Sequence, residues 1–444
     1  MSVAVYKGPF GHEQAERLLW RAGVGPRKGE TEALAKLGVD DAVRSLTRPK
    51  SERWVGPTPR DDKGRALAPA DAWGHDHLWW LDRMVRTSRP LVERMTLVWH
   101  DWFATSTDGV GSQKLMLDQN KLLRRLSLGS FETMLQEITK DPAMLLWLSG
   151  TENSKWSPNE NYARELMELF TLGAGRGYTE RDVREQSRAL TGFANDWRKG
   201  AGTVNFRFER DRHDVGRKRV FGKTGRFDWQ DAVRLCLQHP SHPSFFVDKL
   251  WGYFIPVAPD AATRRSLLAR YKRDFQILPV VDAILRHPAL YTGPRMVKPP
   301  VIYTAGLLRA LGRGVDTQAW SWLSDQSGQR LFRPPNVSGW NDERWLDTAT
   351  FRGRWAVANY ASQPYSLTDK QSADLPAEPK ALVDGAIAFW GSPTLRPETR
   401  AALIGFATKA MGDADSKWKR TSYRFLTANA LRQLVAVSPD LQTC

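Results

Sequence analysis

The sequence predicts an all-α, mainly helical, multi-helix body with one small β-hairpin. Apolar residues recur at three- and four-residue spacing through most of the 444 residues, as they do in helices that bury one face. Proline, glycine and capping residues separate these runs at the intervals expected of helix ends. Only residues 203–208 alternate apolar and polar side chains convincingly in the manner of a strand.

The N-terminal third is predicted to be helical apart from one loop. The segment HEQAERLLWRAG has apolar residues at helical spacing and stops at Gly23 and Gly25. Two short helical patterns, ALAKLG and VDDAVRSLTRP, follow it. Residues 57–69 predict a loop because they are rich in proline, glycine and charge. Further helices are predicted over residues 70–87, 90–104, 113–128 and 131–139, with a short one after Asp141 and Pro142.

The β-hairpin is expected near residues 203–221. Val204, Phe206 and Phe208 share one face of the predicted strand, and residues 219–221 are expected to pair back against it. Helical patterns then resume at residues 229–238, 244–254, 262–273, 279–285, 299–311, 350–360, 380–389, 397–411 and 418–438.

A linker divides the helices into two predicted units. Residues 363–379 carry serine, proline and aspartate, a composition typical of a connection between packed units. We therefore expect a main helical body over residues 1–362, which includes the hairpin, and a C-terminal helical cap over residues 380–444 packed on it.

The charge and aromatic content bear on the class of partner. The formal net charge is +16, yet the arginines are scattered and no zinc finger, RNP motif or GXXG clamp is present, so no specific nucleic-acid motif is identified. Charge alone predicts weak attraction to acidic polymers. The 19 tryptophans are expected mainly to fill gaps between helices, with a ring-binding cleft as the alternative.

The sequence also bears on location. No stretch approaches the roughly 20 apolar residues of a transmembrane helix, and the first residues show no export signal. Cys236 and Cys444, the only cysteines, supply neither a disulfide framework nor a Cys-rich zinc site. A cytoplasmic location is expected.

The most charged helical pattern is SPNENYARELMELFTLG. Asn159 is the predicted N-cap and the helix is expected to run to Gly173. Four-residue spacing stacks Glu160, Arg164 and Glu168 on one side of this helix.

Carboxylates of this helix are candidates for chemistry. Glu165 and Glu168 have the spacing of paired carboxylates, which can act in acid–base catalysis or bind a divalent metal. The cofactor is unknown, and a divalent metal is one candidate. Arg164 and Asn161 are candidates for substrate binding. The alternative is a solvated ladder of ion pairs, each worth roughly a few tenths of a kcal/mol.

Three further segments carry candidate residues. His100 and Asp101 interrupt the apolar run MTLVWHDWF, where His100 is either a catalytic group or a hydrogen-bonded core residue. His213 and Asp214 begin a glycine-bearing turn that is either an anion grip, with Lys218, or a well-made hairpin turn.

The fourth segment, FRPPNVSGWNDERWLDTATFRGRW, predicts a rigid loop leading to a capped helix. Trp340 in this loop is a candidate for substrate binding. The segment contains no G-x-S-x-G elbow, so Ser338 is a poor nucleophile candidate.

Taken together, these segments resemble the bacterial "domain of unknown function 1800" family. The matching stretches are AERLLWRAGVGP, WWLDRMVRTSRPLVERMTLVWHDWFATS, KDPAML, PNENYARELMELFTLG, YTERDVREQSRALTGF, RHDVGRK, KPPVIYTAGLLRALG and PPNVSGWNDERWLDTAT. The resemblance implies no established reaction. Relatives commonly read H-N-H-F where this chain reads HDWF from His100, so the second histidine of a His-x-His metal pair is absent here.

Two functions are compatible with these residues. The first is a hydrolase-like enzyme with a polar site between helices, acting on an unknown small molecule through acid–base or metal-assisted chemistry. Its catalytic candidates are His100, Asp101, Glu165, Glu168, His213 and Asp214, and its binding candidates are Arg164, Lys218, Asn161 and Trp340. The alternative is a non-enzymatic binding or scaffold protein for an acidic polymer or a protein partner.

Overall fold

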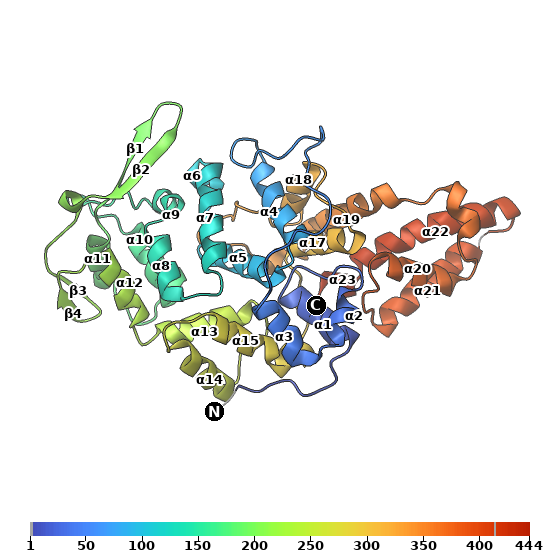
Figure 1. Cartoon of the computed structure of the whole chain (residues 1–444), viewed down its shortest axis with the longest axis horizontal. Helices are drawn as coiled ribbons and strands as arrows, with labels where there is room; N and C mark the ends of the chain where they lie inside the picture. Colours follow the sequence, from blue (N-terminus) through green and yellow to red (C-terminus); the bar gives the residue numbers. More distant parts are fainter. Residues whose placement is uncertain (1–2, 413) are drawn as a thin grey trace.

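The computed structural model describes residues 3–412 and 414–444 and confirms the mainly helical fold (Figure 1). The first helices are α1 (His12–Arg21), α2 (Glu30–Ala35), α3 (Gly38–Thr47), α4 (His75–Arg86), α5 (Pro90–Trp102), α6 (Thr107–Val110), α7 (Gln113–Leu126), α8 (Phe131–Thr139) and α9 (Pro142–Trp147). The middle of the chain contains α10 (Asn161–Glu165), the π-helix η1 (Leu166–Thr171), α11 (Glu180–Ala189), α12 (Trp229–Leu237), α13 (His242–Gly252), α14 (Ala261–Tyr271), α15 (Leu278–Arg286) and α16 (Pro288–Thr292).

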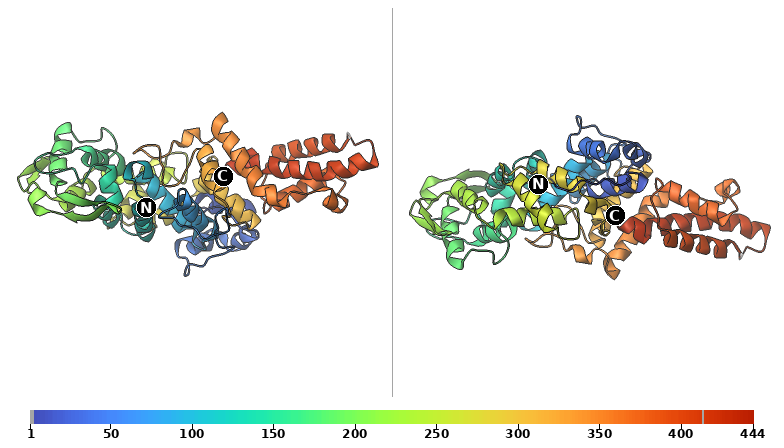
Figure 2. Two further views of the ribbon diagram at one scale, coloured as in Figure 1. Left: turned by 90° about the horizontal axis from the view of Figure 1, so that it is seen from above. Right: turned by 90° about the horizontal axis from the view of Figure 1, so that it is seen from below.

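The C-terminal helices are α17 (Pro300–Leu311), α18 (Ala319–Gln326), α19 (Thr348–Ser362), α20 (Pro379–Phe389), α21 (Pro397–Gly412), α22 (Lys417–Val437) and α23 (Pro439–Gln442). Short 3-10 turns occur at η2 (Arg210–Arg212), η3 (Asp342–Arg344), η4 (Gln363–Tyr365) and η5 (Asp369–Asp374). The molecule is elongated, with the hairpins at one end and α20, α21 and α22 at the other (Figure 2).

The described residues form two hairpins where one was predicted. The predicted strand 203–208 is confirmed as β2 (Gly202–Phe208), but its partner is β1 (Phe193–Arg198), not residues 219–221. Residues 219 and 220 belong to β3 (Lys218–Val220), which pairs with β4 (Lys223–Gly225), and Phe221 begins the turn between these strands. The reason is local: Phe221 and Gly222 both have positive φ, of 48° and 77°, which closes a two-residue turn onto the following strand.

Helix α5 lies between two apolar cores. Trp99 and Trp102 belong to a core that extends over α8, α12 and α13, while Leu97 belongs to a second core with α4 and α17. Pro90 stands in the first turn of α5, where its missing N–H is harmless. Since almost every residue of α5 is buried, this helix is a rigid support for any side chain it points into a cavity.

The segment predicted as one charged helix is divided. Helix α10 begins at Asn161, and the side chain of Asn159 accepts a hydrogen bond from the Asn161 N–H at 2.9 Å. The wider turns of η1 follow, and three successive carbonyls at its C-terminal end accept side-chain hydrogen bonds from α5 and α13. These pairs are Leu169 with Lys249, Phe170 with Trp102, and Thr171 with His242.

The C-terminal helices meet the body at both ends of their unit. Helices α20, α21 and α22 contact one another, and α22 also contacts α19 of the body. After α22 the chain returns to the body, where Thr443 forms a β-bridge with Val297 and the Cys444 N–H donates to the Met296 carbonyl at 2.9 Å. The division into a body over residues 1–362 and a cap over residues 380–444 is kept as a proposal.

Candidate functional site

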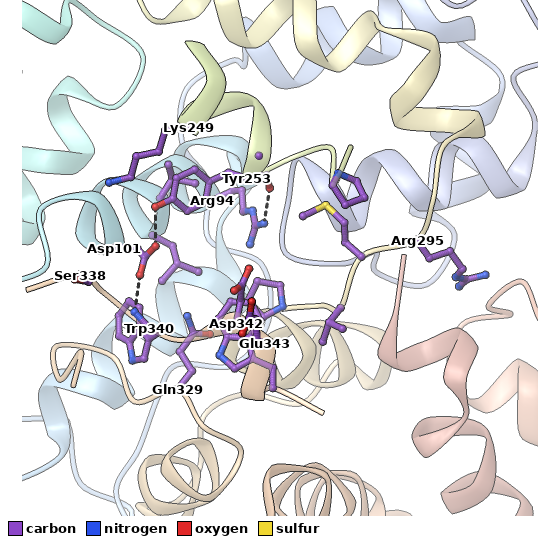
Figure 3. Close-up of a pocket in the computed structure, with 18 residues that line it drawn as sticks. Arg94, Asp101, Lys249, Tyr253, Arg295, Gln329, Ser338, Trp340, Asp342 and Glu343 are labelled. Carbon is purple, nitrogen blue, oxygen red and sulfur yellow. Dashed lines mark hydrogen bonds between the residues drawn. The ribbon is translucent and has the colours of Figure 1, made fainter. Parts of the chain in front are cut away.

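A cavity of about 570 Å³ opens between α5, α13, residues 295–299 and the loop before α19 (Figure 3). Its volume lies in the range of pockets that bind small molecules, roughly 300–1,000 Å³. Two of the residues singled out in the sequence, Asp101 and Trp340, line it.

Helical spacing brings two sets of side chains to the cavity. Residues three and four apart share one face of a helix, and such sets on α5 and at the end of α13 point inward. The set on α5 is Arg94, Leu97, Val98 and Asp101, and the set on α13 is Lys249, Gly252 and Tyr253.

The loop before α19 closes the side of the cavity at Asp101. The Asn336 side chain accepts a hydrogen bond from the Ser338 N–H at 2.9 Å, which sets the loop into a tight turn. Gly339 then has φ +91°, and a Cβ at this position would lie 2.3 Å from Asp101 Oδ1. Only glycine allows this approach, and it lets the Trp340 N–H donate to Asp101 Oδ1 at 2.9 Å.

Asp101 is held through both of its oxygens. Oδ1 accepts from the Trp340 N–H, and Oδ2 accepts from the Tyr253 hydroxyl at 2.6 Å. Burial raises the pKa of Asp101, and these two hydrogen bonds oppose the rise by favouring the charged form. The carboxyl is therefore fixed in orientation, and each oxygen retains a lone pair for a ligand.

Lys249 supplies a positive charge near this carboxyl. Its Nζ donates to the Leu169 carbonyl at 3.0 Å and lies 4.4 Å from the centre of the Trp102 ring. Burial lowers the pKa of Lys249 to about 8, although the charge of Asp101 acts to raise it. Since an ammonium has three N–H donors and one is used here, two are left for a ligand.

The remaining polar groups differ in depth. Arg94 is buried, donates to the Tyr253 carbonyl at 3.2 Å, and has its pKa lowered to about 10 by burial. Asp342 and Glu343 are exposed on the opposite wall. Charges of both signs therefore face the cavity.

His100 lies behind the cavity wall. It is 1% exposed, and its ring packs against Trp80, Phe332 and Trp340 with centroids 5.3 to 5.6 Å apart. Burial lowers its pKa to about 3, so the ring stays neutral at physiological pH. Neither ring nitrogen has a hydrogen-bond partner among the residues that the structure describes.

The charged residues of α10 and η1 form an ion-pair cluster away from the cavity. Arg164 lies 3.1 Å from Glu160, 3.5 Å from Glu168 and 2.8 Å from Glu180 of α11. Burial and the neighbouring Glu168 raise the pKa of Glu165. Asn161, also a candidate, is exposed and does not line the cavity.

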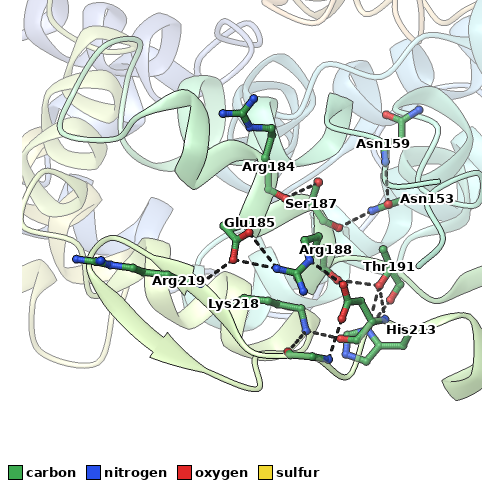
Figure 4. A network of polar contacts seen from close by, with 12 residues as sticks. Asn153, Asn159, Arg184, Glu185, Ser187, Arg188, Thr191, His213, Lys218 and Arg219 are labelled. Atoms are coloured by element: carbon green, nitrogen blue, oxygen red, sulfur yellow. Dashed lines mark hydrogen bonds and ion pairs between the residues drawn. The ribbon is translucent and has the colours of Figure 1, made fainter. Parts of the chain in front are cut away.

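The turn around His213 is a closed network of hydrogen bonds (Figure 4). The His213 ring contacts the Thr191 carbonyl at 2.8 Å, and Arg188 pairs with Asp214 at 2.7 Å. Lys218 donates to the carbonyls of Asp214 and Gly216. Burial opposes ionisation of Asp214, yet the hydrogen bond from Arg188 gives it a lowered pKa overall.

The ten candidates therefore fall into separate places. Asp101 and Trp340 share the cavity, whereas the α10–η1 residues and the His213 turn lie toward the hairpin end of the molecule (Figure 1). No group of three or more His, Cys, Asp or Glu side chains with metal-binding spacing occurs within residues 3–412 and 414–444.

Sequence reasoning did not identify Lys249, Tyr253 or Arg94. The segment FFVDKLWGYF predicts a helix over 244–254, and its apolar spacing alone marks none of its polar members as functional. A lysine and a tyrosine four residues apart at the end of a helix share one face, and this spacing is the signal that the sequence offers. The sequence does not show which element faces this lysine and tyrosine, because Asp101 lies 152 residues away from Tyr253 in the chain.

The chain belongs to the family described as "Protein of unknown function (DUF1800)", whose model matches residues 17–443. This confirms the resemblance predicted from the sequence motifs. Neither the curated proteins nor the solved structures contained a match to the chain. The family description names no reaction, so a function has to be argued from the cavity.

Proposed function

We propose that this member of the DUF1800 family is a hydrolase-like enzyme that cleaves a small polar substrate in the cavity around Asp101. The observation that carries the proposal is the orientation of this carboxyl by Tyr253 and Trp340 beside Lys249. A positioned base can activate water, and a positioned positive charge can stabilise the oxyanion that forms in acyl hydrolysis.

The proposed step uses groups that line the cavity. Asp101 takes a proton from a water molecule, and the oxygen of that water adds to the acyl carbon. A free N–H of Lys249 stabilises the negative charge that develops on the carbonyl oxygen. The tetrahedral intermediate then collapses: the bond from the acyl carbon to the leaving oxygen or nitrogen breaks, and that atom takes the proton from Asp101, which returns the carboxylate to its starting state.

This proposal predicts a bell-shaped dependence of kcat/KM on pH. Asp101 must be ionised to act as a base, so activity falls as pH drops through its raised pKa. Lys249 must be protonated to stabilise the oxyanion, so activity falls again as pH rises through about 8.

The test is hydrolysis of short-chain p-nitrophenyl esters by wild type, D101N and E165Q. We expect D101N to lose at least about 100-fold in kcat/KM, the scale of a general base, and E165Q to stay within about threefold of wild type. Esters that wild type does not hydrolyse at any pH, or equal losses in D101N and E165Q, would contradict the proposal. Circular dichroism of each variant checks that the fold is retained.

The second candidate function, binding of an acidic polymer, rests on one specific feature. Trp156 and Trp197 are 67% and 72% exposed near the hairpin end, and Lys155 lies 4.7 Å over the Trp156 ring. Exposed rings interleaved with cations favour polyanion binding. Filter binding of heparin across a salt series tests it: salt-dependent binding that W156A weakens supports this function, and salt-independent binding opposes it.

The location of the protein within the cell is a separate proposal. Within the described residues, no helix combines the length and apolar character that crossing a membrane demands. The cytoplasmic location expected from the sequence is kept as a proposal.

A further inference from the structure

A second cavity, of about 400 Å³, lies between the loop preceding α5 and the end of α7, on residues the proposed hydrolysis does not use. Arginine dominates its polar lining, through Arg89, Arg124 and Arg125, and Glu52 is its one acidic residue. Ser127 and the apolar Val92 and Leu128 complete most of the wall.

Two of the four charged groups already have partners. Arg124 makes a bidentate pair with the buried Glu93, at 2.7 and 2.9 Å. Glu52 accepts hydrogen bonds from Arg83 at 3.3 Å and from the Thr87 hydroxyl at 3.1 Å. These contacts neutralise the Arg124 and Glu52 charges within the protein.

Arg89 and Arg125 are different. No guanidinium nitrogen of either residue has a hydrogen bond or ion pair with any described residue, and the Nε of Arg89 is buried without a partner. Arg125 lies in the last turn of α7, where a cation is favourable without any ligand. Arg89 has no such explanation, because it precedes the first turn of α5, where the positive end of the helix dipole disfavours a cation.

We infer that this cavity binds a doubly charged phosphoryl group carried by a small organic molecule. Two unpaired arginines beside a third supply the charge and the forked donors that phosphate oxygens accept. The volume is within the range of small-molecule pockets, roughly 300–1,000 Å³, and Val92 and Leu128 offer apolar contact to an organic portion.

Calorimetric titration with inorganic phosphate, phenyl phosphate and phenol tests the inference. At constant ionic strength, wild type is expected to bind phenyl phosphate at one site with a Kd below about 1 mM, and phenol not at all. Tighter binding of phenyl phosphate than of inorganic phosphate identifies a phosphate monoester as the ligand, and the reverse order identifies the free ion.

R89Q and R125Q are each expected to weaken binding at least about tenfold. R352Q, which removes the same charge from an exposed position on α19, is the matched control and is expected to bind as wild type. Absence of saturable binding to wild type, or equal weakening in all three variants, overturns the inference. Neither result depends on ester hydrolysis, so the two proposals fail separately.

Discussion

Two regions of this protein carry dense charge, and they use it differently. Around Arg164 and around His213, charged groups pair with one another within the protein, Arg164 with Glu160 and Glu180, and Arg188 with Asp214. Around Asp101, hydrogen bonds fix the orientation of the carboxyl. Both this carboxyl and the Lys249 ammonium keep some hydrogen-bonding capacity, and both residues line a cavity.

The difference shows why charge density in a sequence is a poor guide to a site. The ladder on α10 and η1 attracts attention because four-residue spacing is visible in the sequence, yet that spacing also satisfies the charges locally. The cavity collects charged residues from distant segments, with Arg94 and Asp101 on α5, Lys249 on α13, and Asp342 and Glu343 on η3. The region around Asp101 differs from the ladder because its polar groups have unused hydrogen-bonding capacity and line a cavity.

The largest expected effect comes from filling the turn beside Asp101. G339A places a Cβ against Asp101 Oδ1 at φ +91° and is expected to cost about 3 kcal/mol in the free energy of unfolding. Its counterpart near the ladder, G175A, also has positive φ but meets no atom within 4 Å, so about 1 kcal/mol is expected. Urea unfolding of both variants measures the contrast, and equal costs would mean that the contact with Asp101 is unimportant.

Lysine titration sharpens the comparison inside the protein. Burial lowers the pKa of both Lys249 and Lys298 to about 8 from a usual 10.5. D101N is expected to lower mainly the Lys249 pKa, because the Asp101 charge raises it, whereas Cys444 and Glu16 are the charges that raise the Lys298 pKa. NMR of the lysine side-chain resonances, assigned with K249M, measures both. A Lys249 resonance that titrates at the same pH in D101N as in wild type would show that the Asp101 charge does not act on Lys249, against the account.

Removing the Tyr253 hydroxyl tests what holds the carboxyl. In Y253F, Asp101 loses the 2.6 Å hydrogen bond that favours its charged form, so its pKa is expected to rise. The acidic limb of the pH–rate profile should move to higher pH with it. Carboxyl ¹³C titration gives the pKa directly, and an unchanged value would show that Tyr253 does not tune Asp101.

The smallest effect is expected at the ladder. R164Q breaks three half-exposed ion pairs and is expected to cost only about 0.5 kcal/mol in the free energy of unfolding. Hydrolysis at the cavity should be unchanged. A large loss of activity in R164Q would return the acidic helix to the site and weaken the comparison.

Much of the fold was predictable because helix ends carry local signals. The bounds of α8 agree with the predicted helix 131–139, and the proline at the start of α5 places its first turn. Helix α18 was not predicted, since AWSWLSDQ shows little helical periodicity and its form depends on packing against α19. The predicted partner of β2 was wrong because strand pairing is decided by turns, which β1 and β2 close at Gly200 and Gly202 with positive φ.

The candidate site was predictable only in part. Asp101 stood out as a carboxylate in an apolar run, and Trp340 stood in a loop with clear turn chemistry. Their contact joins positions 239 residues apart, and no local pattern reports such a contact. Lys249 and Tyr253 belong to the site because the fold places the end of α13 beside Asp101 of α5, and the sequence does not show this arrangement.

Crystallographic fragment screening tests the central claim most directly, because it does not require the substrate to be identified first. The cavity at Asp101 has partly free polar groups and a volume of about 570 Å³, whereas the ladder on α10 and η1 pairs Glu160 and Glu168 with Arg164. Bound fragments are expected to cluster beside Asp101, Lys249 and Trp340, with polar atoms within hydrogen-bond distance of the Asp101 carboxyl. Fragments that gather instead on the Glu165 face, and leave the cavity empty, would contradict the account.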